Sequence, residues 1–327
     1  ALEAYDQVAV TRATEAQVAS TSESCEGVSR KAVTRPVHPE AVNADLELAA
    51  PLACEFDWRG PGAAQRDSEL FDVAMGCVDR AGAMARSCLN APEDELDRTW
   101  LCDPPDAALS LLLDATDPSV LARRVVELAQ ACKRIAAAQP PLVRARLPCK
   151  IFGDTHGQLR DILLLFASFG APTHKNAGDV ELCSYVLNGD FIDRGEHQVA
   201  LVALLFALKA LYPQRIYLVR GNHEFRSTSE RMGPTSFRAA CSRAFPPADA
   251  HEVYEACFGV FEWLPLAALV ADRILVVHGG VGDGSWRLED LAAGVPRPLS
   301  DLRVAPAWVV QALWSDPSGS DADMRRG

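Results

Sequence analysis

Four short apolar segments, each ending at a glycine and a polar side chain, constrain the fold of this chain more than any other feature. The segments read CKIFGD, SYVLNGD, RIYLVRGN and RILVVHGG. Two of the stretches between them, HGQLRDILLLFASFG and HQVALVALLFALKALYP, are patterned as helices, and the second is apolar on nearly every side. Ahead of the first segment, Asp117 and Pro118 predict the start of another helix, which Pro140 and Pro141 end. Strands that alternate with helices indicate an α/β layered core.

The polar residues at the ends of these strands are the candidate functional site. They are Asp154, with His156 two positions later, Asp190, Asn222 and His278. Ligands of α/β proteins bind beyond the carboxyl ends of the strands, so we expect these side chains to converge at the rim of a sheet. The neighbouring glycines let the chain turn sharply and keep side-chain bulk away from a ligand. Each motif alone is typical of a turn or a helix cap, but their joint occurrence favours a site.

Carboxylates, imidazoles and an amide oxygen together suit divalent transition metals such as Mn, Fe or Zn. One ion would be held by Asp154, His156 and Asp190. A second would share Asp190 as a bridge and add Asn222 and His278. Two carboxylates do not neutralise two dications, so the centre would attract a phosphate and a hydroxide. Pairs of ions in such sites act on the attacking and leaving oxygens of a displacement.

Composition excludes several other classes of protein. The formal net charge of −12 disfavours a sequence-independent nucleic-acid binder, which needs a basic surface. Ten cysteines occur without a C-x-x-C pair, which is typical of reduced thiols rather than a zinc ribbon. The apolar run from Val199 to Leu208 is too short to span a bilayer, and the start, ALEAYDQVAV, lacks the plan of a signal peptide. We therefore expect an intracellular protein, cytoplasmic or nuclear, that binds neither nucleic acid nor membrane.

Six motifs in order resemble the signature of the phosphoprotein phosphatase family, the metal-dependent serine/threonine protein phosphatases that include calcineurin. They are GDTHGQ (153–158), GDFIDRG (189–195), GNHE (221–224), LPLAA (264–268), HGG (278–280) and WSDP (314–317). The first three occur across the calcineurin-like metallophosphoesterase superfamily, and the last three narrow the match to protein phosphatases. The resemblance covers about residues 109–327 and implies a layered core, a β-sandwich flanked by helices.

The resemblance implies the same two sets of metal ligands and a function. The function is the hydrolysis of phosphoserine and phosphothreonine in proteins by direct attack of a metal-bridging hydroxide. It also implies phosphoprotein substrates and regulatory subunits as partners. Two alternatives stay open, namely a metallophosphoesterase acting on dinucleoside polyphosphates and a catalytically weak pseudophosphatase scaffold.

The remaining roles that the resemblance implies concern proton transfer and phosphate binding. His223 would be the general acid that protonates the departing oxygen, and Asp193 would orient its imidazole. Arg194 would grip phosphate oxygens with its planar guanidinium group. Arg326, near the end of the chain, resembles a second phosphate-binding arginine, although Arg325 competes for that role.

Two stretches that interrupt the chain, Asn90-Ala91-Pro92 and Asp103-Pro104-Pro105, place a domain boundary near residue 105. Residues 1–105 are weakly patterned, and we expect a partly disordered N-terminal extension. Apolar residues at helical spacing indicate one short helix within it, namely Leu70, Val73, Cys77 and Ala81. Residues 106–327 are expected to form a catalytic domain that is incomplete at its C-terminus. The family continues with a further histidine ligand of the second metal, so we expect weak or no activity from the chain as given.

Smaller differences between this chain and the family pattern concern the groove near the phosphate. Glu230 and Met232 stand where the family usually has an arginine and an aromatic residue. We expect Glu224 to support its turn rather than to touch substrate.

Overall fold

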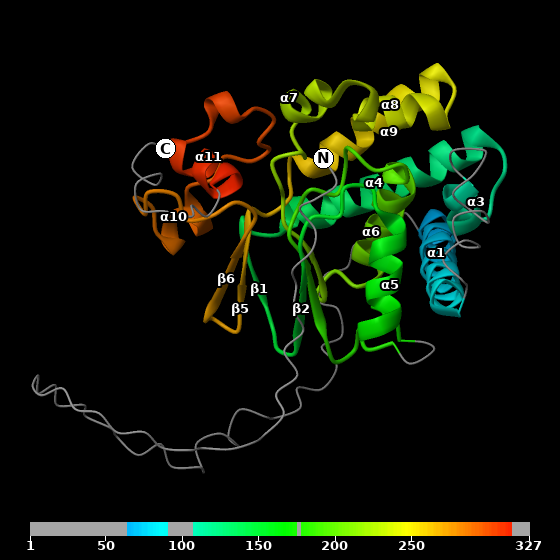
Figure 1. The fold of residues 1–327 in the computed structure, drawn as a ribbon, viewed down its shortest axis with the longest axis horizontal. Coiled ribbons are helices and arrows are strands. Elements are labelled where there is room, and N and C mark those ends of the chain that lie inside the picture. Colours follow the sequence, from blue (N-terminus) through cyan, green and yellow to red (C-terminus); the bar gives the residue numbers. More distant parts are fainter. Residues whose placement is uncertain (1–63, 91–106, 175–177, 316–327) are drawn as a thin grey trace, which may run out of the picture. The chain divides into compact units, whose positions relative to one another are not determined.

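The computed structural model describes residues 64–90, 107–174 and 178–315, and all of them lie in one compact unit (Figure 1). The strands are β1 (Leu142–Ala145), β2 (Cys149–Phe152), β3 (Ser184–Leu187), β4 (Ile216–Leu218), β5 (Ala267–Val270) and β6 (Ile274–Val277). The longer helices are α1 (Ala64–Asn90), α3 (Ala107–Leu113), α4 (Pro118–Ala138), α5 (Leu159–Phe169), α6 (Gln198–Leu211), α8 (Phe237–Ala244), α9 (Pro247–Phe261) and α11 (Ala307–Trp314). The short ones are α7 (Arg226–Ser229), η2 (Glu230–Thr235), α10 (Leu288–Ala293) and η3 (Leu302–Val304).

The six strands form two three-stranded sheets. In one sheet β2, β3 and β4 run parallel, and in the other β1 is parallel to β5, which is antiparallel to β6. Apolar side chains from both sheets, among them Val186, Val219 and Val270, form a shared buried layer. Helices α5 and α6 cover the outer face of the first sheet, and α10 and α11 pack on the second (Figure 1). The predicted α/β core, a β-sandwich flanked by helices, is confirmed.

Local signals place most elements where the sequence predicts them. The four predicted strands are β2, β3, β4 and β6, and the two predicted helices between them are α5 and α6. Helix α4 begins at Pro118 because the Asp117 carboxylate accepts the backbone N–H of Ser119 at 2.8 Å. One expectation is wrong: the four strands do not share a sheet, because β6 pairs with β5 in the second one. His278 therefore approaches the rim from the other half of the sandwich.

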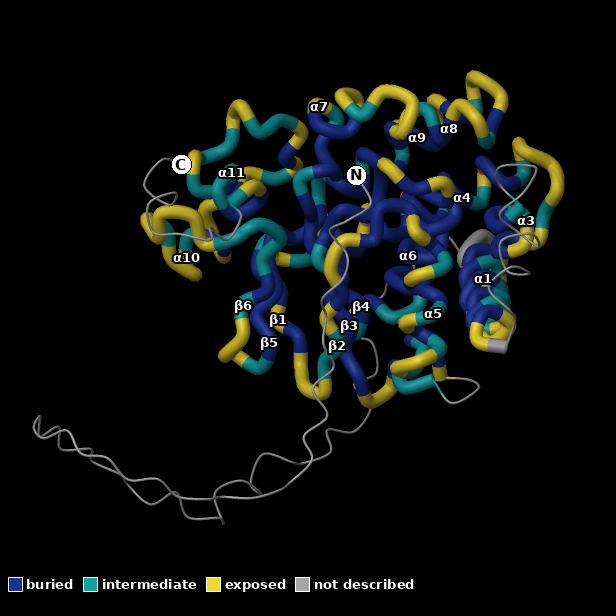
Figure 2. Tube along the Cα trace, in the orientation of Figure 1, coloured by how far each residue is buried: buried dark blue, intermediate teal, exposed yellow. Residues whose placement is uncertain are grey.

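Helix α1 is the short helix that the spacing of Leu70, Cys77 and Ala81 indicates, but it runs for 27 residues. These three side chains are buried, and the helix packs against α5 and α6 within the same apolar core. Because α1, α4 and α8 surround α6, that helix is buried along its length, as Figure 2 shows. The rest of the predicted extension lies outside the described residues, and the division at residue 105 stays a prediction.

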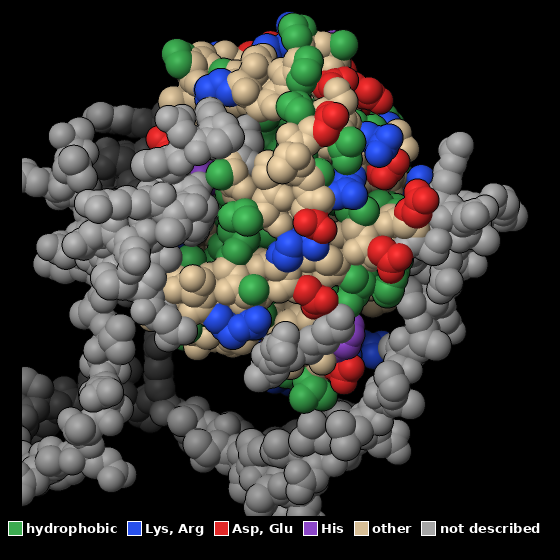
Figure 3. Space-filling model, turned by 90° about the vertical axis from the view of Figure 1, so that its right-hand side faces the viewer, with side chains coloured by type: hydrophobic (Ala, Val, Ile, Leu, Met, Phe, Trp, Pro, Cys, Tyr) green, Lys and Arg blue, Asp and Glu red, His purple; other side chains and the backbone are tan. Residues whose placement is uncertain are grey.

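The described surface is mixed in charge. On the face in Figure 3, acidic and basic side chains are interspersed, with apolar side chains between them. The seven described cysteines are free thiols, and six of them are buried. Among the described residues, no helix combines the length and apolar character that crossing a bilayer requires.

Helix α1 supplies a test of its place in the core. Ala74→Glu puts a carboxylate at a site that is 1% exposed, so we expect the free energy of unfolding to fall by about 3 kcal/mol or more. Phe71→Glu, on the same helix at a residue that is 47% exposed, should change it by less than about 1 kcal/mol. Urea unfolding curves of the two variants measure the difference. Equal midpoints would show that α1 is not part of the core.

Buried Lys209 supplies a second test, through pH. Its Nζ donates to the carbonyl oxygens of Pro213 at 3.1 Å and Ile216 at 2.6 Å, and burial lowers its pKa from 10.5 to about 7. Between these values the unfolded chain holds a proton that the folded chain has lost, so this group makes stability rise with pH. Lys209→Met removes that contribution. We expect the wild type to gain stability over the variant as pH rises from 7 to 10 in urea denaturation, and a constant difference would refute the assignment.

Candidate metal centre

Loops from both sheets bring the predicted ligands together. Asp154 and His156 follow β2, Asp190 follows β3 and Asn222 follows β4, so the parallel pairing of these strands places their carboxyl ends at one edge. His278 follows β6 and reaches the same edge from the second sheet. The site thus lies where the two halves of the sandwich meet.

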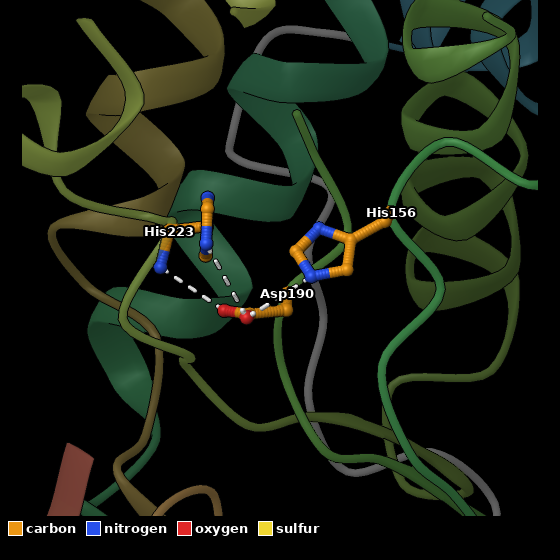
Figure 4. Close-up of side chains that lie close together, drawn as sticks. All are labelled: His156, Asp190 and His223. Atoms are coloured by element: carbon orange, nitrogen blue, oxygen red, sulfur yellow. Dashed lines mark hydrogen bonds and ion pairs between the residues drawn. The ribbon is translucent and has the colours of Figure 1, made fainter. Parts of the chain in front are cut away.

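Asp190 is the centre of the cluster and is 3% exposed. Its Oδ2 lies 3.4 Å from His156 Nε2, and its Oδ1 lies 3.3 Å from His278 Nε2. The exposed carboxylate of Asp154 lies 3.9 Å from each of these two imidazoles. Figure 4 shows Asp190 between His156 and His223, whose Nε2 is 3.9 Å from Asp190 Oδ2. Two groups of three residues bring carboxylate and imidazole atoms within 4.8 Å of one another. One group is Asp154, Asp190 and His278, and the other is His156, Asp190 and His223.

Unpaired polar atoms show that these residues fit divalent ions. His156 Nε2 and Asn222 Oδ1 are both buried, and neither makes a hydrogen bond. The opposite nitrogen, His156 Nδ1, donates to the carbonyl oxygen of Ile192 at 2.7 Å, which turns the lone pair of Nε2 toward Asp190. His278 Nδ1 donates to the carbonyl oxygen of Asn188 at 2.7 Å in the same way. Buried acceptors without donors, with imidazoles fixed from behind, are what a metal site requires.

The charges of the cluster couple metal binding to protons. Burial lowers the pKa of His156, which favours the neutral imidazole that an ion requires. Burial acts in the same direction on His278, but its hydrogen bond to Asp190 and the charge of that carboxylate outweigh it and raise the pKa to about 9. Burial would raise the pKa of Asp190, but His278 and His223 hold it below its usual range. An ion at His278 must therefore displace a proton, and metal affinity rises with pH.

His223 is held by a buried carboxylate. Its Nδ1 donates to Asp193 Oδ2 at 2.7 Å, and the other oxygen of Asp193 accepts Ser229 Oγ–H at 2.6 Å and Phe237 N–H at 2.8 Å. Burial disfavours the charged imidazole, but the bond to Asp193 and the charge of Asp190 outweigh it, so the pKa of His223 is raised. Arg194 Nη2 lies 3.3 Å from His223 Nε2. The imidazole of His223 and the guanidinium group of Arg194 thus lie side by side at the site.

Glu224 supports its own turn, as the sequence predicts, and also ties that turn to the loop after β3. Its carboxylate accepts the backbone N–H groups of Asp190 at 2.8 Å, Phe191 at 2.8 Å and Gly221 at 2.9 Å. The loops also approach closely at glycines, since a Cβ on Gly189 would lie 2.5 Å from the Gly221 backbone. Glycine at these positions is therefore required by space as well as by the turn.

Three further points concern one predicted arginine, the family position held by Glu230, and a residue that the sequence did not reveal. Arg326 and its competitor Arg325 lie outside the described residues, so the second phosphate-binding arginine stays a prediction. Glu230 pairs with Arg238 at 2.6 Å and accepts the Tyr254 hydroxyl at 3.1 Å. Sequence reasoning missed Ser229, which holds Asp193 from 36 positions away and belongs to no motif.

Removing the bridging carboxylate should empty the centre. Asp190→Asn keeps the shape of the side chain but removes the charge shared by both predicted ion positions, so we expect fewer than about one ion per chain. Asp193→Asn is the matched control, because that carboxylate binds His223, Ser229 and Phe237. Elemental analysis after dialysis against Mn²⁺ measures both variants. Retention of two ions by Asp190→Asn would contradict the bridging role.

Comparison with known proteins agrees with this geometry. Residues 147–325 match the family model described as calcineurin-like phosphoesterase. The chain is 34% identical over 198 residues to serine/threonine-protein phosphatase BSL2 of Arabidopsis thaliana, covering 61% of this chain and 19% of that protein. It is 30% identical over 223 residues to the serine/threonine-protein phosphatase PP2A-like PPG1 of Candida albicans, and this match covers 67% of this chain and 49% of that protein.

Among solved structures, a protein serine/threonine phosphatase from Saccharomyces cerevisiae with similarity to human phosphatase PP5 superposes with a TM-score of 0.53. It is 29% identical, and the match covers 61% of this chain and 60% of that one. The chain thus spans less than half the length of the two curated relatives. It belongs to the calcineurin-like phosphoesterase family, and the three proteins compared above are serine/threonine protein phosphatases.

Proposed function

We propose that this chain hydrolyses phosphoserine and phosphothreonine in proteins, at the low rate expected from its sequence, with water as the nucleophile and no phosphoenzyme. The observation that carries the proposal is the placement of the Asp193–His223 pair and Arg194 beside the cluster around Asp190. In this arrangement the metal ligands around Asp190, the acid His223 and the phosphate-binding Arg194 would all act on one phosphate. The names of the relatives support a phosphoprotein as the substrate.

The ion-binding residues would be Asp154, His156 and Asp190 for one ion, and Asp190, Asn222 and His278 for the other. When bound, Mn, Fe or Zn would polarise the phosphate and make hydroxide available at neutral pH. The chain's own contribution is to fix the ligands from behind, through Asn188, Ile192 and Glu224.

His223 would protonate the departing serine or threonine oxygen from Nε2. An alkoxide is a poor leaving group, so a proton delivered as the bond breaks lowers the barrier. Asp193 accepts the Nδ1–H at 2.7 Å, and against the effect of burial this bond raises the pKa of the ring, which favours the proton that Nε2 would donate. Phosphate hydrolysis at an alkyl oxygen is the chemistry that such a buried pair favours.

Arg194 would bind the oxygens of the phosphate that do not react. Arg194 is exposed while its backbone N–H donates to the Thr235 carbonyl at 2.9 Å, so the loop is fixed and the guanidinium group, which lies 3.3 Å from His223 Nε2, can reach a ligand. A planar fork of N–H groups matches two phosphate oxygens at once.

Regulatory subunits as partners and a location in the cytoplasm or nucleus are part of the same proposal. The free thiols of the described cysteines support a reducing compartment.

His223→Gln tests the acid. We expect kcat on a phosphoserine peptide with Mn²⁺ to fall by about 10²- to 10⁴-fold, because the leaving oxygen departs unprotonated. The fall on p-nitrophenyl phosphate should be smaller, since that leaving group needs no proton. His251→Gln, at an exposed position on α9, is the control and should match the wild type.

A substrate panel tests the class of substrate. The wild type should prefer the phosphoserine peptide to a dinucleoside tetraphosphate. Preference for the dinucleotide would replace the proposed function with the alternative one.

A further inference from the structure

Gln198, the first residue of α6, is a buried polar side chain whose amide is fully engaged. It is 0% exposed, and it belongs to none of the motifs. Its Oε1 accepts the backbone N–H of Asp193 at 2.9 Å, and its Nε2 donates to the carbonyl oxygens of Gly195 at 2.9 Å and Thr235 at 3.0 Å. Both N–H donors and the oxygen therefore have partners, and all three partners are backbone groups.

The turn that Gln198 binds has an unfavourable backbone conformation. Asp193 and Arg194 have φ angles of 68° and 69°, in the left-handed region that side chains other than glycine rarely adopt. Two such residues in succession persist only where surrounding contacts hold them. The amide of Gln198 binds the turn at its first and last residues, Asp193 and Gly195.

The same amide reaches the segment that holds the Asp193 carboxylate. The Thr235 carbonyl accepts both Gln198 Nε2 and the Arg194 backbone N–H, and two residues later the Phe237 N–H binds Asp193 Oδ1. Gln198 thus joins the two backbone segments whose spacing decides where that carboxylate points.

Gln198 also packs against the first loop of the site. A Cβ on Gly157, the residue after His156, would lie 2.6 Å from Gln198 Cγ. Three segments of the candidate site therefore meet at one side chain, and its length and hydrogen-bonding groups set their spacing.

We propose that Gln198 is a positioning residue that holds the Asp193–Gly195 turn so that Asp193 aligns His223 and Arg194 faces the phosphate. It touches neither substrate nor ion and acts through these three residues. This inference rests on the proposed function for its effect on catalysis, but the positioning itself is a property of the chain.

The test uses Gln198→Met, which keeps the length of the side chain and removes its hydrogen bonds. We expect kcat on a phosphoserine peptide with Mn²⁺ to fall by about 10- to 100-fold, because displacement of an acid by about 1 Å has effects of this size. On p-nitrophenyl phosphate the fall should be smaller, because only the displacement of Arg194 affects a substrate whose leaving group needs no proton. The ratio of the rate on the phosphoserine peptide to the rate on p-nitrophenyl phosphate reports the alignment of the acid. General destabilisation of the protein lowers both rates alike and leaves this ratio unchanged.

Lys209→Met is the matched control on the same helix. It also replaces a buried side chain that donates to two backbone carbonyls, but at the other end of α6 and without contact to the turn. The ratio of the two rates in this variant should equal that of the wild type. An equal change of the ratio in both variants would overturn the inference, because the effect would then belong to α6 as a whole.

Amide hydrogen exchange of the metal-free protein tests the positioning without catalysis. Exchange at residues 193–195 should be faster in Gln198→Met than in the wild type or in Lys209→Met. Should Gln198→Met fail to fold, Gln198→Asn keeps the amide one methylene shorter and should show the same loss of protection. Unchanged exchange overturns the inference, whereas a wild type that hydrolyses no phosphate ester overturns only the proposed function.

Discussion

The buried carboxylate of Asp190 is the constraint on which the rest of the site depends. It lies between two imidazoles, and the backbone N–H of the same residue donates to a second buried carboxylate, that of Glu224. Burial and then the charge of Asp190 raise the pKa of Glu224 to about 7, so the two acids compete for one region of low dielectric. Negative charge in such a place needs positive charge close by. Protonated His278 supplies it in the metal-free chain, and divalent ions would supply more.

This need for charge connects the two sheets. Asp190 belongs to the loop after β3, while His278 belongs to β6 on the other side of the apolar layer that Val186 and Val270 share. A shift of one sheet against the other would separate the two side chains. Packing of the sandwich therefore determines the geometry of the centre, and ion binding would in turn hold the sandwich together.

Local sequence signals predicted a large part of the fold. Strands β2, β3 and β4 are apolar runs ended by turns, α4 has its Asp117 cap, and α6 is a long apolar helix, so each carries its own evidence. Strands β1 and β5 were not predicted, because neither LVRA nor AALV ends at a glycine and a polar residue, and the two become strands by pairing with each other. The extent of α1 was missed for a related reason, since its helix is stabilised by packing on α5 and α6.

The sequence alone shows which residue types follow which strands, and hence that oxygen and nitrogen donors suited to metal ions would gather. Order and spacing along the chain carry that information, because the ends of parallel strands meet wherever the sheet forms. Only the tertiary structure decided that His278 comes from a second sheet, that Ser229 and Phe237 hold Asp193, and that Gln198 spans three loops. Those contacts join residues without a shared local pattern, and close packing of the whole core, not propensity, brings them within hydrogen-bonding distance.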